Sequence, residues 1–171
     1  MSYFRVTIFA LCLAAAGLGA CGFQPLYGQR TGSASAQELA LVTIDTIADR
    51  EGQKLHNFLR DRLNPLGSPP EPFYRLQLKL TTSTRQLAIR KDATASRANL
   101  ILSANFILTD IRTRKVLFRG RSRSTNSYNI LVSEFATIAS LNDATTRAAR
   151  ELSDEISARL AIFFSRRHRG Y

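Results

Sequence analysis

The chain has 171 residues, of which 44% are apolar, and it contains only nine Gly and five Pro. This composition is typical of one folded domain and excludes a collagen-like repeat or a chain that is disordered throughout. The formal charge is +11 at pH 7, so we expect an anionic partner. Beyond the N-terminus no apolar run approaches the roughly 20 residues that a membrane-spanning helix needs, which excludes a polytopic membrane protein.

Residues 1–20 have the pattern of an export signal. Arg5 precedes an uncharged apolar run over residues 6–18, and small residues follow. A buried N-terminal helix is the alternative, but a run without a polar face would suit only a very deep core. The signal ends in a segment that resembles the bacterial lipobox and consists of Leu18, Gly19, Ala20 and Cys21. An ordinary secretory cut after Ala20 would place the bulky Leu18 where a small residue is preferred.

The lipobox resemblance implies that Cys21 is the first mature residue and carries a thioether-linked diacylglycerol and an amide-linked third chain. Several acyl chains, each CH₂ contributing about 0.8 kcal/mol when buried, anchor a protein stably to a membrane. Gly22 stands where inner-membrane lipoproteins of many bacteria carry Asp, so we expect the periplasmic face of the outer membrane. Because Cys12 leaves with the signal, the mature chain is expected to have no free thiol for a disulfide, a metal or a nucleophile.

The mature chain is expected to divide into three parts. Small polar residues over 29–37 are typical of a tether, so residues 21–38 are interpreted as lipidated N-terminus and tether. A single α+β domain is predicted over residues 39–165. A basic tail is predicted over residues 166–171.

The domain is predicted to begin with a strand and a helix. Residues 39–47 are β-branched and apolar, which favours a strand. From Asp49 onward an amphipathic helix is predicted, because apolar residues recur at spacings of three and four. These residues are Leu55, Phe58, Leu59 and Leu63. The helix must end before residues 64–70, where prolines and a glycine break regular structure.

Three strands are predicted over residues 73–129. Apolar and polar residues alternate over 74–80 and over 99–109, which indicates half-buried antiparallel strands. In the third run, Val116 and Phe118 lie on one side and basic residues on the other. The apolar register changes between residues 80 and 87, which predicts a bulge or a strand extension there.

A long helix is predicted over residues 141–164, with Asn142 or Ser140 as its cap. Its apolar stripe consists of Leu141, Ala144, Ala148, Leu152, Ile156, Leu160 and Phe163. Residues 130–140 are ambiguous and are compatible with an earlier helical turn. The order of elements predicts an α+β fold, a two-layer sandwich with two helices packed on one face of a mostly antiparallel four-stranded sheet.

The cations are concentrated in the predicted strands. Residues 73–129 contain twelve Lys or Arg but only two acids. If the apolar side of the sheet packs on the helices, the cations project from the opposite face as a focused positive surface. Export excludes nucleic acid as the partner and leaves lipid phosphates, sugar acids and acidic proteins. Two simpler interpretations remain, namely that Arg usage reflects genome composition and that charge keeps an edge strand soluble.

The sequence offers little for catalysis or for metal and cofactor binding. His56 and His168 have no partner at a recognisable spacing, and a lone helical histidine is usually structural or solvated. No nucleophile elbow, zinc motif, phosphate-binding loop or dinucleotide fingerprint occurs. We therefore expect no enzyme, no metal site and no cofactor.

The chain resembles the lipopolysaccharide-assembly lipoprotein family, LptE, over essentially its whole length. The sharpest element is the segment CGFQPLYG at residues 21–28. The helix sequences IADREGQKLHNFLRDRL and ARELSDEISARLAIFF and the basic antiparallel sheet add to the resemblance.

This resemblance implies a lipoprotein that helps to assemble a large LptD-like outer-membrane β-barrel and plugs its lumen. It also implies a part in delivering lipopolysaccharide to the outer leaflet, so we expect the barrel and lipopolysaccharide as partners. The candidate contacts with anionic glycolipid or barrel are Arg85, Arg90, Lys91, Arg97, Lys115, Arg119, Arg121 and Arg123. The alternative is a lipoprotein pilot or adaptor for a different envelope complex, whose basic face binds an acidic protein.

Overall fold

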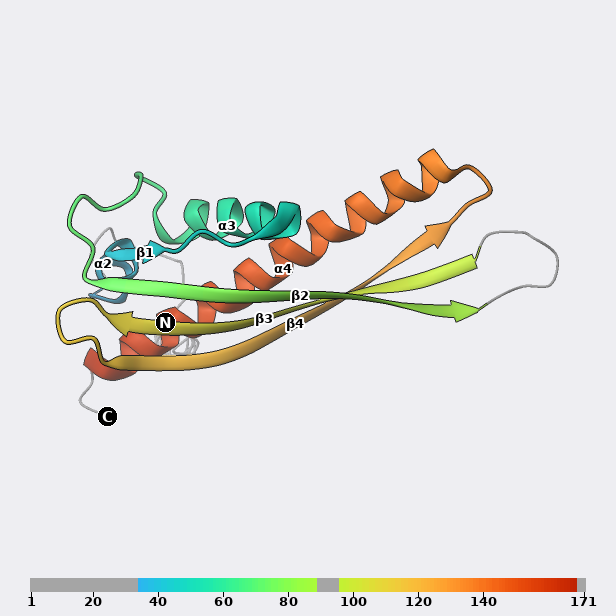
Figure 1. The fold of residues 1–171 in the computed structure, drawn as a ribbon. Coiled ribbons are helices and arrows are strands. Elements are labelled where there is room, and N and C mark those ends of the chain that lie inside the picture. The colour runs from blue at the N-terminus through green and yellow to red at the C-terminus, as the bar shows by residue number, and fades with distance from the viewer. Residues whose placement is uncertain (1–33, 89–95, 169–171) are drawn as a thin grey trace, which may run out of the picture. The chain divides into compact units, whose positions relative to one another are not determined.

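A four-stranded sheet with helices over one of its faces forms the fold (Figure 1). The computed structural model describes residues 34–88 and 96–168. In chain order the elements are α2 (Ala34–Ala40), β1 (Val42–Ile44), α3 (Asp49–Leu63), β2 (Tyr74–Ala88), β3 (Ser96–Asp110), β4 (Val116–Ile130) and α4 (Glu134–His168). The sheet order is β1-β2-β3-β4, with β1 parallel to β2 and the other pairs antiparallel. The predicted α+β class and the mostly antiparallel sheet are confirmed.

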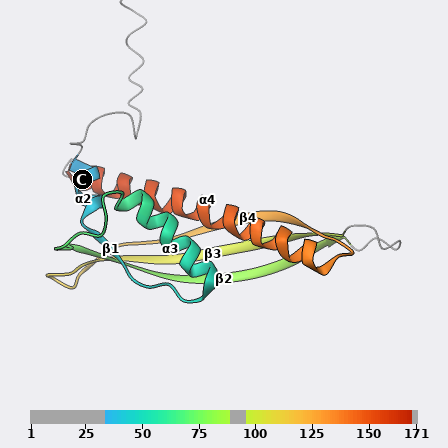
Figure 2. The same cartoon turned by 90° about the horizontal axis from the view of Figure 1, so that it is seen from above.

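The long helix and the long strands match in length. Strands β2, β3 and β4 have 15 residues each, or about 50 Å at about 3.3 Å per residue. Helix α4 has 35 residues, which is also about 50 Å at 1.5 Å per residue. Figure 2 shows α4 running along the sheet, with α3 beside it. Helix α4 is therefore about as long as the strands that it runs along.

The core lies between the sheet and α4. Along β3 the inward-facing side chains are almost completely buried, as alternation predicts for a strand with one face against helices. They are Ala98, Leu100, Leu102, Ala104, Phe106 and Leu108. On α4 the predicted stripe is confirmed at its centre, with Leu152, Ile156 and Leu160 fully buried. At its end Phe164 is the fully buried aromatic residue, whereas Phe163 is only partly buried.

Helix α3 begins and ends where the sequence predicts, and it packs against α4. Leu55, Leu59 and Leu63 are buried, as expected from their spacing. Polar contacts join the same two helices at the surface. The Lys54 ammonium donates to Thr146 Oγ1 at 3.0 Å, and Arg62 pairs with Asp154.

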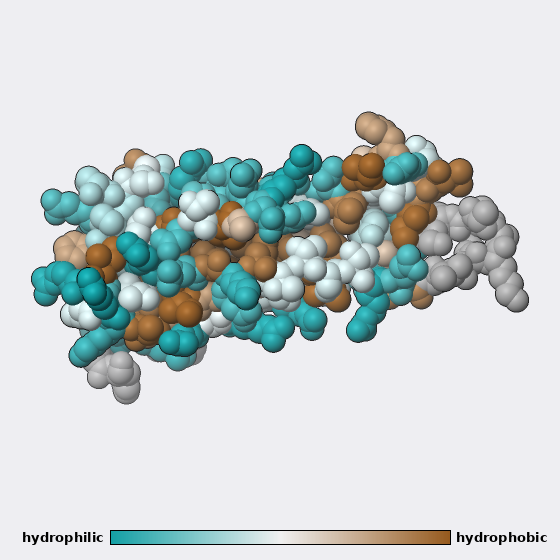
Figure 3. All heavy atoms as spheres, in the orientation of Figure 1, coloured by the Kyte–Doolittle hydropathy of each residue, from teal (hydrophilic) through white to brown (hydrophobic). Residues whose placement is uncertain are grey.

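Helix α4 begins two turns earlier than predicted, at Glu134, so the predicted caps Ser140 and Asn142 are wrong. Ser133 lies at the start instead, where its Oγ accepts a hydrogen bond from the Ala136 amide at 3.4 Å. The early turns escaped prediction because their apolar side chains do not form an inward stripe. Phe135 is 81% exposed, and Figure 3 shows apolar residues gathered at this end of the molecule. At the other end, residues 166–168 of the predicted tail belong to the helix.

The first helix was not predicted. Residues 34–38 were interpreted as tether and residues 39–47 as strand, but α2 covers Ala34–Ala40 and β1 is limited to Val42–Ile44. Ala, Gln, Glu and Leu favour a helix, and Leu39 packs against the core. Glu38 also accepts a hydrogen bond from the Tyr74 hydroxyl. Residues 29–33 of the predicted tether lie outside the described residues.

The change of apolar register in β2 reflects a strand extension. Pairing with β3 is unbroken from Tyr74 to Gln86, and the irregularity lies between Gln86 and Ala88. The strand thus extends through residues 81–86, and the irregularity follows directly at its end. The pattern changes there because residues 81–87 are exposed on both faces of the sheet.

Tyr74 predicts a loss of stability at alkaline pH. Burial and the hydrogen bond to Glu38 raise the pKa of Tyr74 from 10.0 to about 12. The protonated phenol therefore stabilises the fold fully below pH 10, and this stability is lost as the pH rises toward 12. Relative to Tyr74→Phe, the wild type should lose about 1 kcal/mol more unfolding free energy between pH 9 and pH 11 in urea titrations. Equal losses in both proteins would contradict the assignment.

Candidate anion-binding face

The face of the sheet that points away from the helices is rich in cations. Because the even-numbered side chains of β3 face the helices, the odd-numbered ones lie on the other face. The pairing register then gives the residues of β2 and β4 that share it. We define the basic face by the seven cations placed there, which are Arg75, Lys79, Arg85, Arg97, Arg119, Arg121 and Arg123.

Three of the predicted residues are brought together with one that was missed. Arg119, Arg121 and Arg123 alternate along β4, so neighbouring Cα atoms in this series are about 7 Å apart. The register places Asn105 of β3 opposite Arg121, and Lys79 of β2 opposite Asn105. An amide is thus flanked by two cations in one row across the sheet. The alternation of Lys79 with leucines in the sequence was the signal that could have found it.

The other predicted residues lie elsewhere. Arg85 and Arg97 are on the basic face but near its far end, and Arg97 is ten residues along β3 from Ile107, the partner of Arg119. That separation is about 33 Å, so one small anion cannot reach both ends. Lys115 lies in the turn before β4, where its carbonyl accepts a hydrogen bond from the Asp110 amide at 3.0 Å. Arg90 and Lys91 lie outside the described residues.

Among the described residues, acidic side chains do little to offset the positive charge of the basic face. Among the described residues, the acid on this face is Asp45, whose Oδ1 lies 3.7 Å from Arg75 Nε. The guanidinium groups of Arg119, Arg121 and Arg123 belong to exposed residues. Guanidinium groups form bidentate hydrogen bonds with phosphate and carboxylate. The arrangement can therefore hold an extended anionic surface through several weak, solvent-exposed contacts.

Two cavities open on the described part of the molecule. One of about 370 Å³ is lined by Arg75, Thr109, Asp110, Ile111 and Arg114 at the end of the sheet. The Thr113 amide donates to Asp110 at 2.8 Å and lowers the pKa of that carboxyl, so Asp110 stays ionised and opposes anion binding there.

The second cavity, of about 100 Å³, adjoins His56 and is lined by no acid. Within residues 34–88 and 96–168, no three His, Cys, Asp or Glu side chains gather as metal ligands. In the same ranges no helix has the length and apolarity to cross a membrane.

Comparison with known proteins identifies the family. The family model LptE, described as lipopolysaccharide-assembly, matches residues 36–160. The chain belongs to this family. The predicted membership is thus confirmed over residues 36–160.

The chain is also similar to a curated relative in sequence and to solved structures in fold. An uncharacterized protein of Rickettsia prowazekii (strain Madrid E) is 24% identical over 165 residues, which cover 96% of this chain and 99% of the relative. A candidate lipoprotein of Caulobacter crescentus CB15 has a TM-score of 0.66 at 23% identity, covering 79% of this chain and 98% of its own. Rare lipoprotein B of Shewanella oneidensis has a TM-score of 0.56 at 14% identity, and the match covers 70% of this chain and 92% of that structure. These structures share the fold.

Proposed function

We propose that this LptE-family protein assembles with a large LptD-like β-barrel of the outer membrane, plugs its lumen and assists delivery of lipopolysaccharide to the outer leaflet. Its role is one of binding and assembly rather than catalysis. The observation that supports this most is the basic face, where seven cations share one side of the sheet. Lipopolysaccharide carries phosphate and acidic groups, which are the anions that such a face attracts.

The central part of the basic face is the proposed contact with glycolipid. Arg119, Arg121 and Arg123 supply planar guanidinium forks along β4, and Lys79 adds a point charge from β2. Arg85 and Arg97 contact either a second part of the glycolipid or acidic groups of the barrel. The same roles are proposed for Arg90, Lys91 and Lys115.

A lipid anchor would keep the protein beside its barrel. Cys21 lies outside the described residues, and we assign it the acyl chains that the lipobox implies. The domain would then stand on the periplasmic face of the outer membrane. Residues 29–33 would link the anchor to α2.

Purification of tagged protein from detergent-solubilised outer membranes tests the barrel assignment. We expect one large, heat-modifiable β-barrel to accompany the wild type. Recovery of a secretin, or of no barrel, would contradict the plug role and would favour a pilot or adaptor of another complex. Family membership and fold would be unaffected by either result.

Charge reversal tests the basic face. The double variant Arg119→Glu and Arg121→Glu should bind purified lipopolysaccharide at least about tenfold more weakly, because the loss of one charge-assisted hydrogen bond costs about 1.5 kcal/mol. Binding should also depend less on salt, since screening acts on the charges that were removed. Titration calorimetry at two ionic strengths measures both effects.

The matched control reverses two arginines on the other layer of the sandwich, Arg50→Glu and Arg60→Glu in α3. Both residues are exposed, and the change in net charge is the same. We expect wild-type affinity if position rather than total charge matters. An unchanged affinity of the folded Arg119 and Arg121 variant would remove this face from the glycolipid site.

A further inference from the structure

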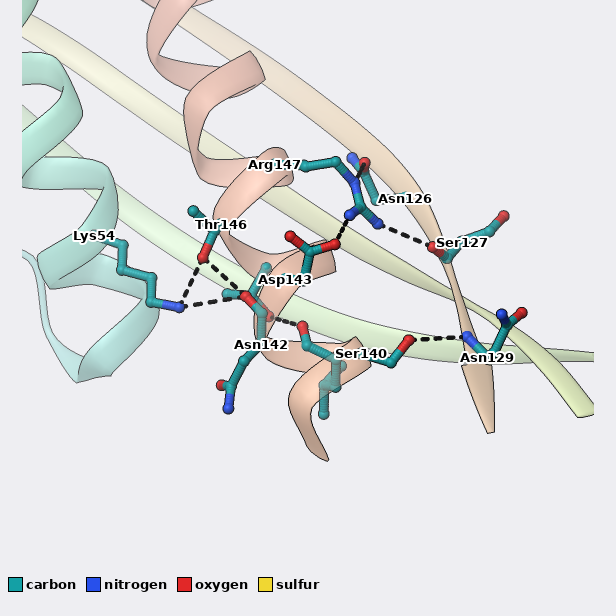
Figure 4. A network of polar contacts seen from close by, with 11 residues as sticks. Lys54, Asn126, Ser127, Asn129, Ser140, Asn142, Asp143, Thr146 and Arg147 are labelled. Atoms are coloured by element: carbon teal, nitrogen blue, oxygen red, sulfur yellow. Dashed lines mark hydrogen bonds and ion pairs between the residues drawn. The ribbon is translucent and has the colours of Figure 1, made fainter. Parts of the chain in front are cut away.

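The two edges of the sheet differ in how many of their outward-facing backbone groups have a hydrogen-bond partner. At the β4 edge, side chains of α4 bond directly to outward-facing backbone groups, and Figure 4 shows two of these contacts. The bonds join Arg159 to Arg121 O (3.0 Å), Arg147 to Ser127 O (3.2 Å) and the Asn129 amide to Ser140 Oγ (3.2 Å). Such contacts occupy backbone groups that a further strand would use. The β4 edge is thus partly closed.

The β2 edge is open over most of its length. Strand β1 pairs only with residues 74–76, and the last bond on this edge runs from the Asp45 amide to Leu76 O at 3.0 Å. That bond shows that the backbone N–H and C=O groups of even-numbered residues in β2 point away from β3. Because the pairing with β3 is unbroken as far as Gln86, the same holds for every even-numbered residue up to Gln86. The outward groups belong to Leu78, Leu80, Thr82, Thr84 and Gln86. In the part of the chain that the structure describes, no partner bonds to them.

This open edge is suited to accept a strand. Residues 78–86 span about 30 Å. Residues 81–87 are exposed on both faces of the sheet. Thr82 and Thr84 are β-branched and favour extended backbone. An unpaired edge of this length is a template for an added strand.

We infer that residues 78–86 bind an extended segment of a partner protein as a fifth strand, next to β2. The side chains on the basic face set its chemistry. Lys79 and Arg85 flank the edge on that face and are about 20 Å apart, so the segment carries carboxylates six positions apart. On the opposite face it meets the half-buried Leu78 and Leu80, and apolar side chains fit there.

The charges argue against a second copy of this chain as the occupant. In a symmetric antiparallel pair of two copies, residues 78–86 of one copy would lie beside residues 78–86 of the other. Lys79 of each copy would then lie opposite Arg85 of the other copy. Like charges directly opposite each other destabilise a strand pair. If the partner is a β-barrel, the strands of its closed wall are already paired on both sides. The added segment would then be a loop or a terminus of that partner. The inference therefore goes beyond the plug role and does not require it.

Photocrosslinking in living cells tests the edge in the full chain. A photoreactive phenylalanine derivative replaces Thr82 in β2, and in the matched control it replaces Thr125 in β4. We expect Thr82 to give an adduct that maps to one partner segment with carboxylates at the stated spacing, and Thr125 to give no adduct with that segment. An adduct with a second copy, with residues 1–33 of the same chain or with lipid, or the absence of any adduct, would overturn the inference.

A backbone variant separates strand pairing from side-chain contact. Thr84→Pro removes an outward-facing amide and no bond to β3, so the sheet should stay intact. Thr84→Val keeps both the amide and the branched side chain. With the photoreactive group at Thr82, we expect Thr84→Pro to reduce the adduct at least tenfold and Thr84→Val to retain it, with thermal unfolding curves to check folding. Equal adduct yields from two folded variants would overturn strand addition.

Amide exchange on the purified protein completes the test. A synthetic peptide copy of the captured segment should slow exchange at Leu78, Leu80 and Thr82 by at least tenfold. The amides of Thr81 and Ser83 point toward β3 and should be slow with or without peptide. If the even-numbered amides are already slow without peptide, the chain covers its own edge and the inference fails.

Discussion

Replacing Gly120 by Val should lower the unfolding free energy by about 3 kcal/mol, the upper part of the range for overpacking a core. Gly120 lies opposite Phe106 in the register of β3 and β4. A Cβ atom at this position would lie 2.8 Å from Cε1 and Cε2 of the Phe106 ring and closer still to Cζ. Because Phe106 is buried in the core and contacts the Phe118 ring at a centroid distance of 5.9 Å, it has little space to move. Urea unfolding followed by circular dichroism measures the change.

A second substitution should reveal the cause. Phe106→Leu removes the far end of the ring, so in combination with Gly120→Val it should cost less than the sum of the two single changes. Residues in direct contact show coupling of about 1 kcal/mol or more in such cycles. Strict additivity would contradict a steric origin.

The control for this prediction is Ser122→Ala on the same strand and the same face. The Ser122 hydroxyl is buried and has no hydrogen-bond partner among the described residues. Its removal should be neutral or slightly stabilising, since an unsatisfied buried polar group is lost. The contrast between neighbours separates the effect of Gly120 from general sensitivity of β4.

Much of the fold is readable from periodicity. The limits of α3 were predicted because an apolar stripe follows Asp49 and a loop rich in proline follows Leu63. Strand β3 and residues 74–80 of β2 were predicted because one face of each meets helices and the other meets water. The same alternation placed Arg119, Arg121 and Arg123 on one face, and the register of β3 and β4 agrees.

Elements without a contrast between a buried and an exposed face were not predicted. Helix α2 is short and is held by contacts with distant residues, such as the Tyr74 hydroxyl on Glu38, which no local pattern encodes. The first turns of α4 carry exposed apolar residues such as Phe135, so no stripe marks them. The open edge of β2 was also invisible, because it depends on β1 ending after three residues.

The candidate site was predicted in part for a related reason. Period-two alternation shows which residues share a face within one strand, but only pairing shows which strands lie side by side. Lys79 therefore joins Arg121 across Asn105 only when the register is known. Arg119, Arg121 and Arg123 alternate along β4 in the pairing register, and their contact with glycolipid stays a prediction.

Replacing Cys21 by Ala should abolish processing and move the protein from the outer to the inner membrane. Without the cysteine, the lipobox offers no residue for lipid attachment, and Leu18 disfavours an ordinary secretory cut. The apolar residues 6–18 then stay on the chain and hold it where export began. Mass spectrometry of the intact protein should find all 171 residues and no acyl chains.

The matched control is Cys12→Ala, which changes the other cysteine of the chain. Cys12 lies inside the apolar run and leaves with the signal, so this variant should be cleaved, lipidated and sorted like the wild type. Fractionation of inner and outer membranes on a sucrose gradient compares the three proteins. If Cys21→Ala is still cleaved and reaches the outer membrane, the anchor lies elsewhere and the tether assigned to residues 21–38 must be redrawn. If both variants fail, the apolar run rather than the lipobox controls processing.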